Sequence, residues 1–129
     1  MRSTIDPAAT PASALLALDC STERISVALC VGERAWTHEG AGGAGASGTL
    51  LASIFALLAQ ARISVHRLDA IAFGRGPGAF TGVRTACSVV QGLGLGADKP
   101  VLPLDTLLAV AEDARKSCAC ADVIAEHRR

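Results

Sequence analysis

The sequence predicts an α/β domain in which helices cover a mixed β-sheet, with the element order β-β-β-α-β-α-β-α. Three observations predict it. Near the N-terminus, three short apolar or alternating segments follow one another with tight turns between them, as in an antiparallel meander. After them, helix-like segments alternate with short apolar segments, which is typical of parallel strands joined by helical crossovers. Half of the 129 residues are hydrophobic but only 3% are aromatic, so Ala, Val, Leu and Ile must build the core.

The meander strands are expected at residues 14–19, 25–31 and 34–38. The first is an apolar run that ends in a carboxylate, Asp19, as expected for a buried central strand. Gly32 and Glu33 make a two-residue hairpin connection between the second and third strands. Residues 40–48 contain almost only Gly and Ala, so a mobile loop is predicted there.

Helices and strands are expected to alternate along the rest of the chain. The helices are predicted at residues 49–62, 80–96 and 106–116. The strands between them are predicted at residues 69–73 and 100–104, and a further strand is expected to begin at 123–125. Ribonuclease-H-like and actin-like domains are built in this order, so the predicted fold resembles theirs.

Composition and charge limit the classes of function. Twelve basic residues balance twelve acidic ones and the sequence pI is near 6.8, whereas a nucleic-acid-binding module that works alone normally carries a basic patch. No apolar run approaches the roughly 18 residues that span a bilayer, and residues 1–13 are expected to form a disordered tail, not a secretory signal. Five cysteines without disulfide-framework or zinc-site spacing fit reduced thiols. We therefore expect a cytoplasmic protein without a membrane contact.

The segment GRGPGAFTGVR at residues 74–84 joins a predicted buried strand to a helix. One interpretation is a phosphate cradle or a tight contact with a partner, because free N–H groups and the helix dipole favour an anion there. A second interpretation is a connection that needs special dihedral angles. Gly82 is followed by Val83 and not by Lys, so the segment is no P-loop. The predicted structural loop residues are Gly74, Arg75, Gly76, Pro77, Gly78, Phe80, Thr81, Gly82 and Arg84.

The turn after the first strand is a second candidate site. Asp19 and Ser21, with Gly76 of the glycine-rich segment, are candidate remnants of a phosphate-binding turn, since actin-like phosphotransferases hold metal and phosphate with an acidic residue at this place. An Asx- or ST-type turn that satisfies local N–H groups would place the same residues here. One carboxylate is weak evidence for a metal, and neither a metal-spaced histidine pair nor a G-x-S-x-G motif occurs. We predict no catalytic residue and no metal ligand.

The helices at 49–62 and 80–96 are apolar almost all the way round. A helix on a sheet normally needs one apolar stripe, with a polar opposite face. The excess predicts an exposed patch of roughly several hundred Å², which commonly marks an association surface. A further domain of the same chain could instead cover this face. The predicted partner-interface residues are Leu51, Ile54, Phe55, Leu58, Val83, Ala86, Val90 and Leu93.

Two segments resemble the bacterial TsaB (YeaZ) family: LALDCSTE at residues 16–23 and DAIAFGRGPGAFTGVR at residues 69–84. The resemblance extends over about residues 14 to 116. It implies an actin-like (ASKHA) fold with ribonuclease-H-like topology, in which residues 14–117 form the N-terminal lobe and 118–129 begin a second lobe that is otherwise missing. The chain departs from the family at Cys20, where Thr is usual, and at Ala46 and Ala52, where His and Pro are frequent.

The resemblance also implies a function. TsaB-like proteins are noncatalytic partners of a TsaD-like catalytic subunit, which makes N6-threonylcarbamoyladenosine at position 37 of tRNAs that read codons beginning with A. A TsaE-like ATPase joins them, tRNA is met only through the complex, and the TsaB-like chain alone forms homodimers through its helical face. No intrinsic cofactor is implied, although ATP or ADP could lie at the shared interface. The sequence is also compatible with an actin-like nucleotide-binding enzyme, an M22 peptidase-like homologue, or an inactive truncated lobe that only homodimerises.

Overall fold

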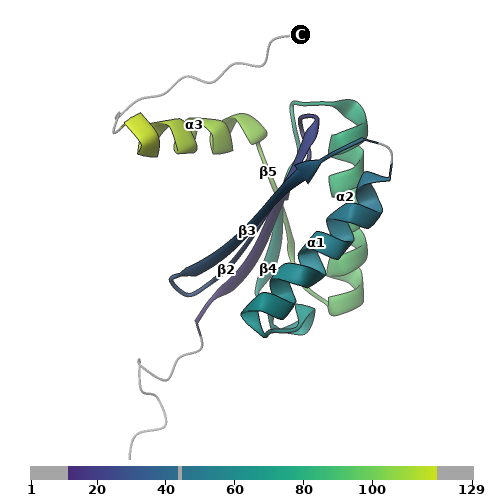
Figure 1. The fold of residues 1–129 in the computed structure, drawn as a ribbon, viewed down its shortest axis with the longest axis vertical. Coiled ribbons are helices and arrows are strands. Elements are labelled where there is room, and N and C mark those ends of the chain that lie inside the picture. The colour runs from purple at the N-terminus through teal and green to yellow at the C-terminus, as the bar shows by residue number, and fades with distance from the viewer. Residues whose placement is uncertain (1–11, 44, 119–129) are drawn as a thin grey trace, which may run out of the picture.

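A computed structural model of the chain describes residues 12–43 and 45–118, which form one five-stranded sheet with the strand order β3-β2-β1-β4-β5 (Figure 1). Strand β1 pairs antiparallel with β2 and parallel with β4, and β5 extends the parallel half. This is the mixed α/β sheet that the sequence predicts. In chain order the elements are β1 (Ala14–Asp19), β2 (Arg24–Val31), β3 (Arg34–Ala41), α1 (Ala46–Ala61), the 3₁₀ turn η2 (Val65–Arg67), β4 (Ala70–Gly74), α2 (Phe80–Ala97), β5 (Val101–Leu104) and α3 (Thr106–Cys118).

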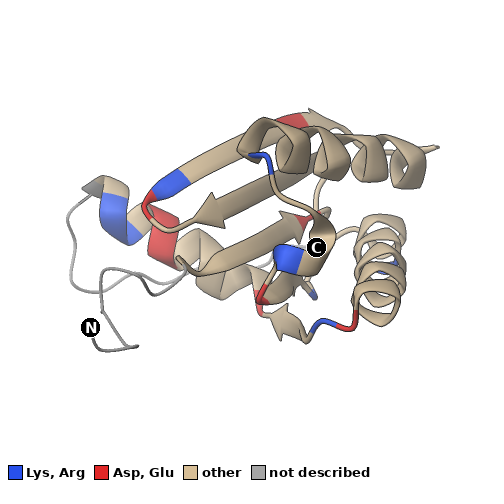
Figure 2. Ribbon diagram, turned by 90° about the horizontal axis from the view of Figure 1, so that it is seen from below, with Lys and Arg blue, Asp and Glu red and all other residues tan. Residues whose placement is uncertain are grey.

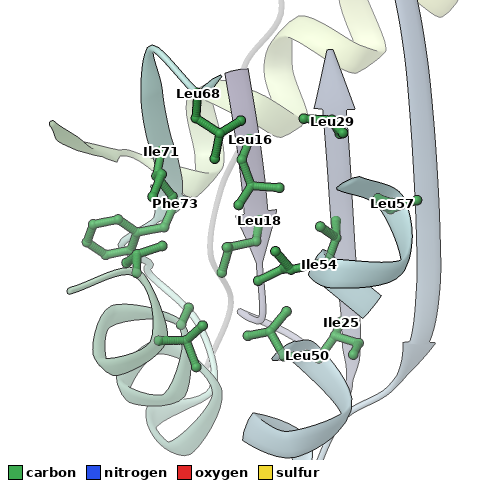
Figure 3. Packing of buried hydrophobic residues seen from close by; sticks show 14 of the residues in the cluster. Leu16, Leu18, Ile25, Leu29, Leu50, Ile54, Leu57, Leu68, Ile71 and Phe73 are labelled. Carbon is green, nitrogen blue, oxygen red and sulfur yellow. The ribbon is translucent and has the colours of Figure 1, made fainter. Parts of the chain in front are cut away.

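Alternation along the strands places the core on one face of the sheet. On β1, Leu16 and Leu18 are buried while Leu15 is 42% exposed, because successive side chains point to opposite faces. The buried set packs against the inward stripe of α1, and Figure 3 shows Leu16 and Leu18 in one cluster with Leu50 and Ile54. Aliphatic side chains from α1, α2, β1, β2 and β4 therefore build a single core.

The two faces of the sheet are covered unequally. Helices α1 and α2 pack side by side on one face (Figure 1). Helix α3 begins directly after β5 and then extends away from the sheet, so that Leu108 and Val110 are 71% and 54% exposed. The floor of the second face is made of small side chains, with Ala17, Ala28 and Ala72 lining a hollow of about 350 Å³.

The predicted glycine- and alanine-rich loop at 40–48 is shorter than expected. Strand β3 continues to Ala41, because Gly40 and Ala41 stay in register with Ile25 and Arg24 of β2. Helix α1 begins at Ala46, three residues before the predicted start, after Gly45 with a φ of 77°. Pairing with β2 thus overrides the local preference for a loop at the β3 end of this segment.

Two of the predicted segments fall on residues without a description. The disordered tail predicted for 1–13 lies outside the described residues except for residues 12 and 13, and the strand expected at 123–125 lies wholly outside them. Across residues 12–43 and 45–118, no helix is both long and apolar enough to cross a bilayer. The edge strand β3 carries Trp36, which packs against the rim of the core and lies under the guanidinium of Arg34 at 4.8 Å.

Candidate functional site

The carboxyl ends of the three parallel strands lie at the same edge of the sheet. There β1 ends at Asp19, β4 at Gly74 and β5 at Leu104. Open α/β sheets bind ligands outside this edge, where the connections that follow the strands meet. The residues that follow are the turn at Ser21, the glycine-rich segment 74–84, and Thr106 at the start of α3.

Four residues from these connections form a hydrogen-bonded cluster, the polar junction, made of Asp19, Ser21, Gly76 and Thr106. The Thr106 hydroxyl donates to Asp19 Oδ2 at 3.0 Å, and the Ser21 N–H donates to Asp19 Oδ1 at 2.7 Å. Since the Thr106 hydrogen is used, Ser21 Oγ donates to Thr106 Oγ1 at 2.9 Å, and the Gly76 N–H also donates to Thr106 Oγ1 at 3.2 Å. The Ser21 and Thr106 side chains are buried, and all their polar atoms have partners.

The structure brings together the three predicted phosphate-turn residues and adds one that sequence reasoning misses. The hydrogen bond from Ser21 N–H to Asp19 is that of an Asx turn, which agrees with the structural interpretation of Asp19. The sequence predicts Thr106 only as the start of a helix. The available signal is its position directly after a parallel strand, which places its hydroxyl at the same sheet edge as Asp19.

Close approach to the turn after β1 explains the glycines of the segment 74–84. A Cβ atom on Gly74 would lie 1.8 Å from Asp19 Oδ2, one on Gly78 would lie 2.5 Å from Ser21 Cβ, and one on Gly82 would lie 1.8 Å from the Cys20 carbonyl oxygen. Such distances leave no room for a side chain at any of the three. The glycines therefore let the loop and the start of α2 pack directly on the turn.

The N–H groups of the same loop are bonded within the protein. Arg75 N–H donates to the Leu104 carbonyl at 2.8 Å, and Ala79 N–H donates to the Ser21 carbonyl at 2.6 Å. With the Gly76 N–H on Thr106, three donors that a phosphate cradle would use are bound to protein acceptors. These contacts favour the structural interpretation of the loop. Of the remaining predicted loop residues, Phe80, Thr81 and Arg84 are exposed on the first turns of α2.

The predicted partner interface needs a correction. Ile54, Leu58, Ala86 and Val90 are at most 3% exposed, because they form the stripes with which α1 and α2 pack on the sheet. They belong to the core, and the prediction that they contact a partner is wrong. Phe55 is 51% exposed, and Leu51, Val83 and Leu93 are half-buried.

The exposed sides of α1 and α2 form a different surface, here called the outer helical face. Helix α1 has no charged residue, and Arg84 is the one charge of α2, so both ribbons are almost uncoloured in Figure 2. Leu95 and Phe80, which the sequence does not predict for the interface, are 88% and 73% exposed. The exposed residues of this face are Ser47, Gly48, Thr49, Ala52, Phe55, Ala56, Ala59, Gln60, Phe80, Thr81, Arg84, Ser88, Gln91, Gly92, Leu95 and Gly96.

A polar hollow of about 380 Å³ lies at one end of the outer helical face, where the start of α1 meets the first turns of α2. The Arg84 guanidinium lies over the Phe80 ring at 4.9 Å from its centre. In the part of the chain that the structure describes, no carboxylate lies within 4.0 Å of the Arg84 nitrogens. The hollow is lined by Ser47, Phe80, Thr81, Arg84, Thr85 and Ser88.

The chain is similar to known proteins in both sequence and structure. A family model described as "TsaD: tRNA N6-adenosine threonylcarbamoyltransferase" matches residues 46–122. The tRNA threonylcarbamoyladenosine biosynthesis protein TsaB of Haemophilus influenzae is 44% identical over 112 residues, which are 86% of this chain and 47% of that protein. The structure of YeaZ from Pseudomonas aeruginosa matches with a TM-score of 0.77 and 46% identity over 83% of this chain and 50% of that one. The chain thus spans about half the length of these relatives.

The structure of RuvC from Thermus thermophilus is similar in fold alone, with a TM-score of 0.51 and 15% identity over 89% of this chain and 84% of that one. Together with the YeaZ structure it confirms the predicted actin-like α/β fold with ribonuclease-H-like topology. The sequence motifs, the fold and the relatives agree. The chain belongs to the family that the TsaD model describes, and its sequence and fold are similar to those of the TsaB (YeaZ) proteins within it.

Proposed function

We propose that the protein is a noncatalytic partner of a TsaD-like catalytic subunit in the threonylcarbamoylation of adenosine 37 in tRNAs that read codons beginning with A. The observation that carries the proposal is the outer helical face, a surface of two adjacent helices with Arg84 as its only charge. The names of the relatives supply the pathway, because TsaB is described as a tRNA threonylcarbamoyladenosine biosynthesis protein.

The physical argument is the cost of leaving this face in water. Phe55, Phe80 and Leu95 project from it, while Gly48, Gly92 and Gly96 have open space where a Cβ would stand, so another helix can approach closely. Burial of apolar surface contributes about 25 cal/mol per Å², which amounts to several kcal/mol for such a face before association costs are subtracted. A protein partner is therefore the natural occupant of the face.

The polar junction supports a noncatalytic role. Its hydroxyl and N–H groups are bonded to one another, and its one carboxylate, Asp19, holds the turn and Thr106. In this proposal the chain needs no cofactor of its own, and a nucleotide such as ATP or ADP would lie at the contact with the catalytic subunit. A TsaE-like ATPase joins the same complex in the cytoplasm, and tRNA is bound through the complex. Without its partner the chain forms a homodimer.

The test is complex formation with the TsaD-like subunit of the same bacterium, followed by size-exclusion chromatography with light scattering. The unmodified chain should co-elute with the subunit, and Leu95→Glu should abolish co-elution without loss of helical signal. Leu108→Glu is the matched control, because Leu108 is 71% exposed on α3, outside this face. If the unmodified chain does not co-elute, or if Leu95→Glu and Leu108→Glu behave alike, the proposal is wrong.

An actin-like nucleotide-binding enzyme is the second candidate, favoured by the position of Asp19 at the carboxyl ends of the parallel strands. Calorimetry with ATP and Mg²⁺ separates the two. Saturable binding of ATP by the isolated chain, lost in Asp19→Asn, would support the enzyme. Injection heats equal to the heats of dilution would support the noncatalytic partner.

A further inference from the structure

We infer that the protein that covers the outer helical face inserts an acidic side chain, Asp or Glu, into the polar hollow beside Arg84. This protein is the catalytic partner and not a second copy of the chain. The inference rests on the proposed function, because it names the chemistry that the catalytic partner must present. It concerns one end of the face, whereas the proposed function concerns the face as a whole.

The hollow is shaped for a carboxylate. It holds one guanidinium, and its remaining polar side chains are the hydroxyls of Ser47, Thr81, Thr85 and Ser88. Stacking on Phe80 holds the guanidinium over the ring. A guanidinium presents paired N–H donors that match the two oxygens of a carboxylate. The hydroxyls of Ser47, Thr81 and Ser88 add single donors, whereas the Thr85 hydroxyl donates to the Thr81 carbonyl at 2.9 Å.

The start of α2 adds to the positive potential of the hollow. Phe80 and Thr81 are the first two residues of the helix, and its N-cap, Ala79, has no side chain that could accept a hydrogen bond. The first N–H groups of a helix have no partner inside the helix and carry partial positive charge. A carboxylate beside Arg84 therefore also lies near the favourable end of the α2 dipole.

Covering the face makes a counter-charge necessary. Arg84 is exposed and has water around it in the free chain. A partner that lies across α1 and α2 removes this water, and an unpaired guanidinium in a covered apolar surface is strongly unfavourable. Because α1 has no charged residue and α2 has no acidic one, the chain itself offers no carboxylate on this face.

The absence of acidic residues from α1 and α2 also argues against a second copy of the chain as the preferred partner of this face. Two copies that meet through this face bring together two arginines and no acidic side chain from the face. The acidic residue next along the chain is Asp98, the C-cap at the far end of α2. It meets Arg84 of a second copy only if two α2 helices lie antiparallel along their whole length. A homodimer is therefore expected to be weaker than the complex with an acidic partner.

The experiment measures two dissociation constants for each variant: that of the complex with the TsaD-like subunit and that of the homodimer. Arg84→Gln should weaken the complex about tenfold and Arg84→Glu by more than about a hundredfold, since charge reversal replaces attraction by repulsion. Neither change should weaken the homodimer. Arg34→Glu is the matched control, because Arg34 is also exposed and stacked on an aromatic ring, but lies on the edge strand β3. It should change neither constant.

A charge swap identifies the partner group directly. Asp and Glu residues on the surface of the TsaD-like subunit are changed one at a time to Arg, and one of them should restore binding to Arg84→Glu while weakening binding to the unmodified chain. Three outcomes would overturn the inference: Arg84→Glu binds like the unmodified chain, no reversal restores binding, or Arg84→Glu abolishes the homodimer and Asp98→Arg restores it. If Leu95→Glu still abolishes the complex in these cases, the proposed function stands without the acidic contact. If the unmodified chain never binds, the proposed function itself fails.

Discussion

The Thr106 hydroxyl donates a hydrogen bond of 3.0 Å to Asp19 Oδ2 and thereby links the first residue of α3 to the last residue of β1. Gly74 lies beside this pair, and the absence of its side chain is what leaves room for the contact. Two hydroxyls, one carboxylate and two backbone N–H groups thus connect the ends of three strands to one another.

Gly74→Ala should lower the free energy of unfolding by about 2 kcal/mol or more, since the new methyl group would lie 1.8 Å from Asp19 Oδ2. Gly92→Ala is the control. A Cβ at Gly92 meets open space on the surface of α2, so this change should raise stability by about 0.5–1 kcal/mol through helix propensity. Urea unfolding followed by circular dichroism measures both. Equal effects of the two substitutions would contradict the close approach.

Thr106→Val keeps the shape of the side chain and removes its hydroxyl. It should cost about 1–3 kcal/mol, because Ser21 Oγ, Asp19 Oδ2 and the Gly76 N–H each lose their buried partner. Thr106→Ser retains the hydroxyl and should recover most of this loss. The same unfolding measurement applies, and a Thr106→Val protein as stable as the unmodified chain would show that the junction contributes nothing.

Neighbouring residues on α1 should respond in opposite ways. Ile54→Ala should lower stability by about 2–5 kcal/mol, since Ile54 is fully buried against the sheet. Phe55→Ala should leave stability within about 0.5 kcal/mol, because Phe55 is half-exposed, but it should weaken association with the TsaD-like subunit. Thermal melts and binding assays on the two variants separate core residues from surface residues.

The Cys20 thiol should resist alkylation up to high pH. Burial raises its pKa from the ordinary value of 9.0 to about 11, and the negative charge of Asp19 acts in the same direction. Exposed Cys30 should therefore be modified before Cys20 at pH 8. Iodoacetamide labelling with peptide mass spectrometry resolves the two sites, and faster labelling of Cys20 than of Cys30 would contradict the prediction.

The same pKa shift makes stability depend on pH. Between pH 9 and pH 11 the folded state keeps the Cys20 proton that the unfolded state releases, so stability falls as the pH rises through this range, by about 2–3 kcal/mol in all. Cys20→Ala should remove this part of the pH dependence. Unfolding curves of both proteins at pH 8 and pH 11 provide the comparison.

The order of elements, their approximate bounds and the mixed sheet could be predicted from the sequence, because apolar alternation and helical spacing report directly on local structure. The side of α1 that faces the sheet could not be predicted from the sequence. Ile54 and Phe55 are both large and apolar, and a helix that is apolar all the way round contains no signal for which side meets the sheet. Only the way in which α1 packs on β2 and β3 decides this.

The candidate site could be predicted in part for a similar reason. Asp19 and the glycine-rich segment are recognisable because each has a local pattern. Thr106 has none, since its role depends on β5 ending at the same sheet edge as β1, with β4 between them. The predicted loop at 40–48 is partly wrong because pairing of β3 with β2 is a tertiary contact that composition does not contain.

The position of Trp36 has a practical consequence for all these measurements. It is the one indole of a chain that has no tyrosine, and it lies on the outermost strand under Arg34. Its emission therefore reports the packing of β3 against the rim of the core, whereas circular dichroism reports the helices as a whole. Where fluorescence and circular dichroism yield different unfolding midpoints, the difference between the midpoints measures how independently the edge strand β3 separates from the sheet.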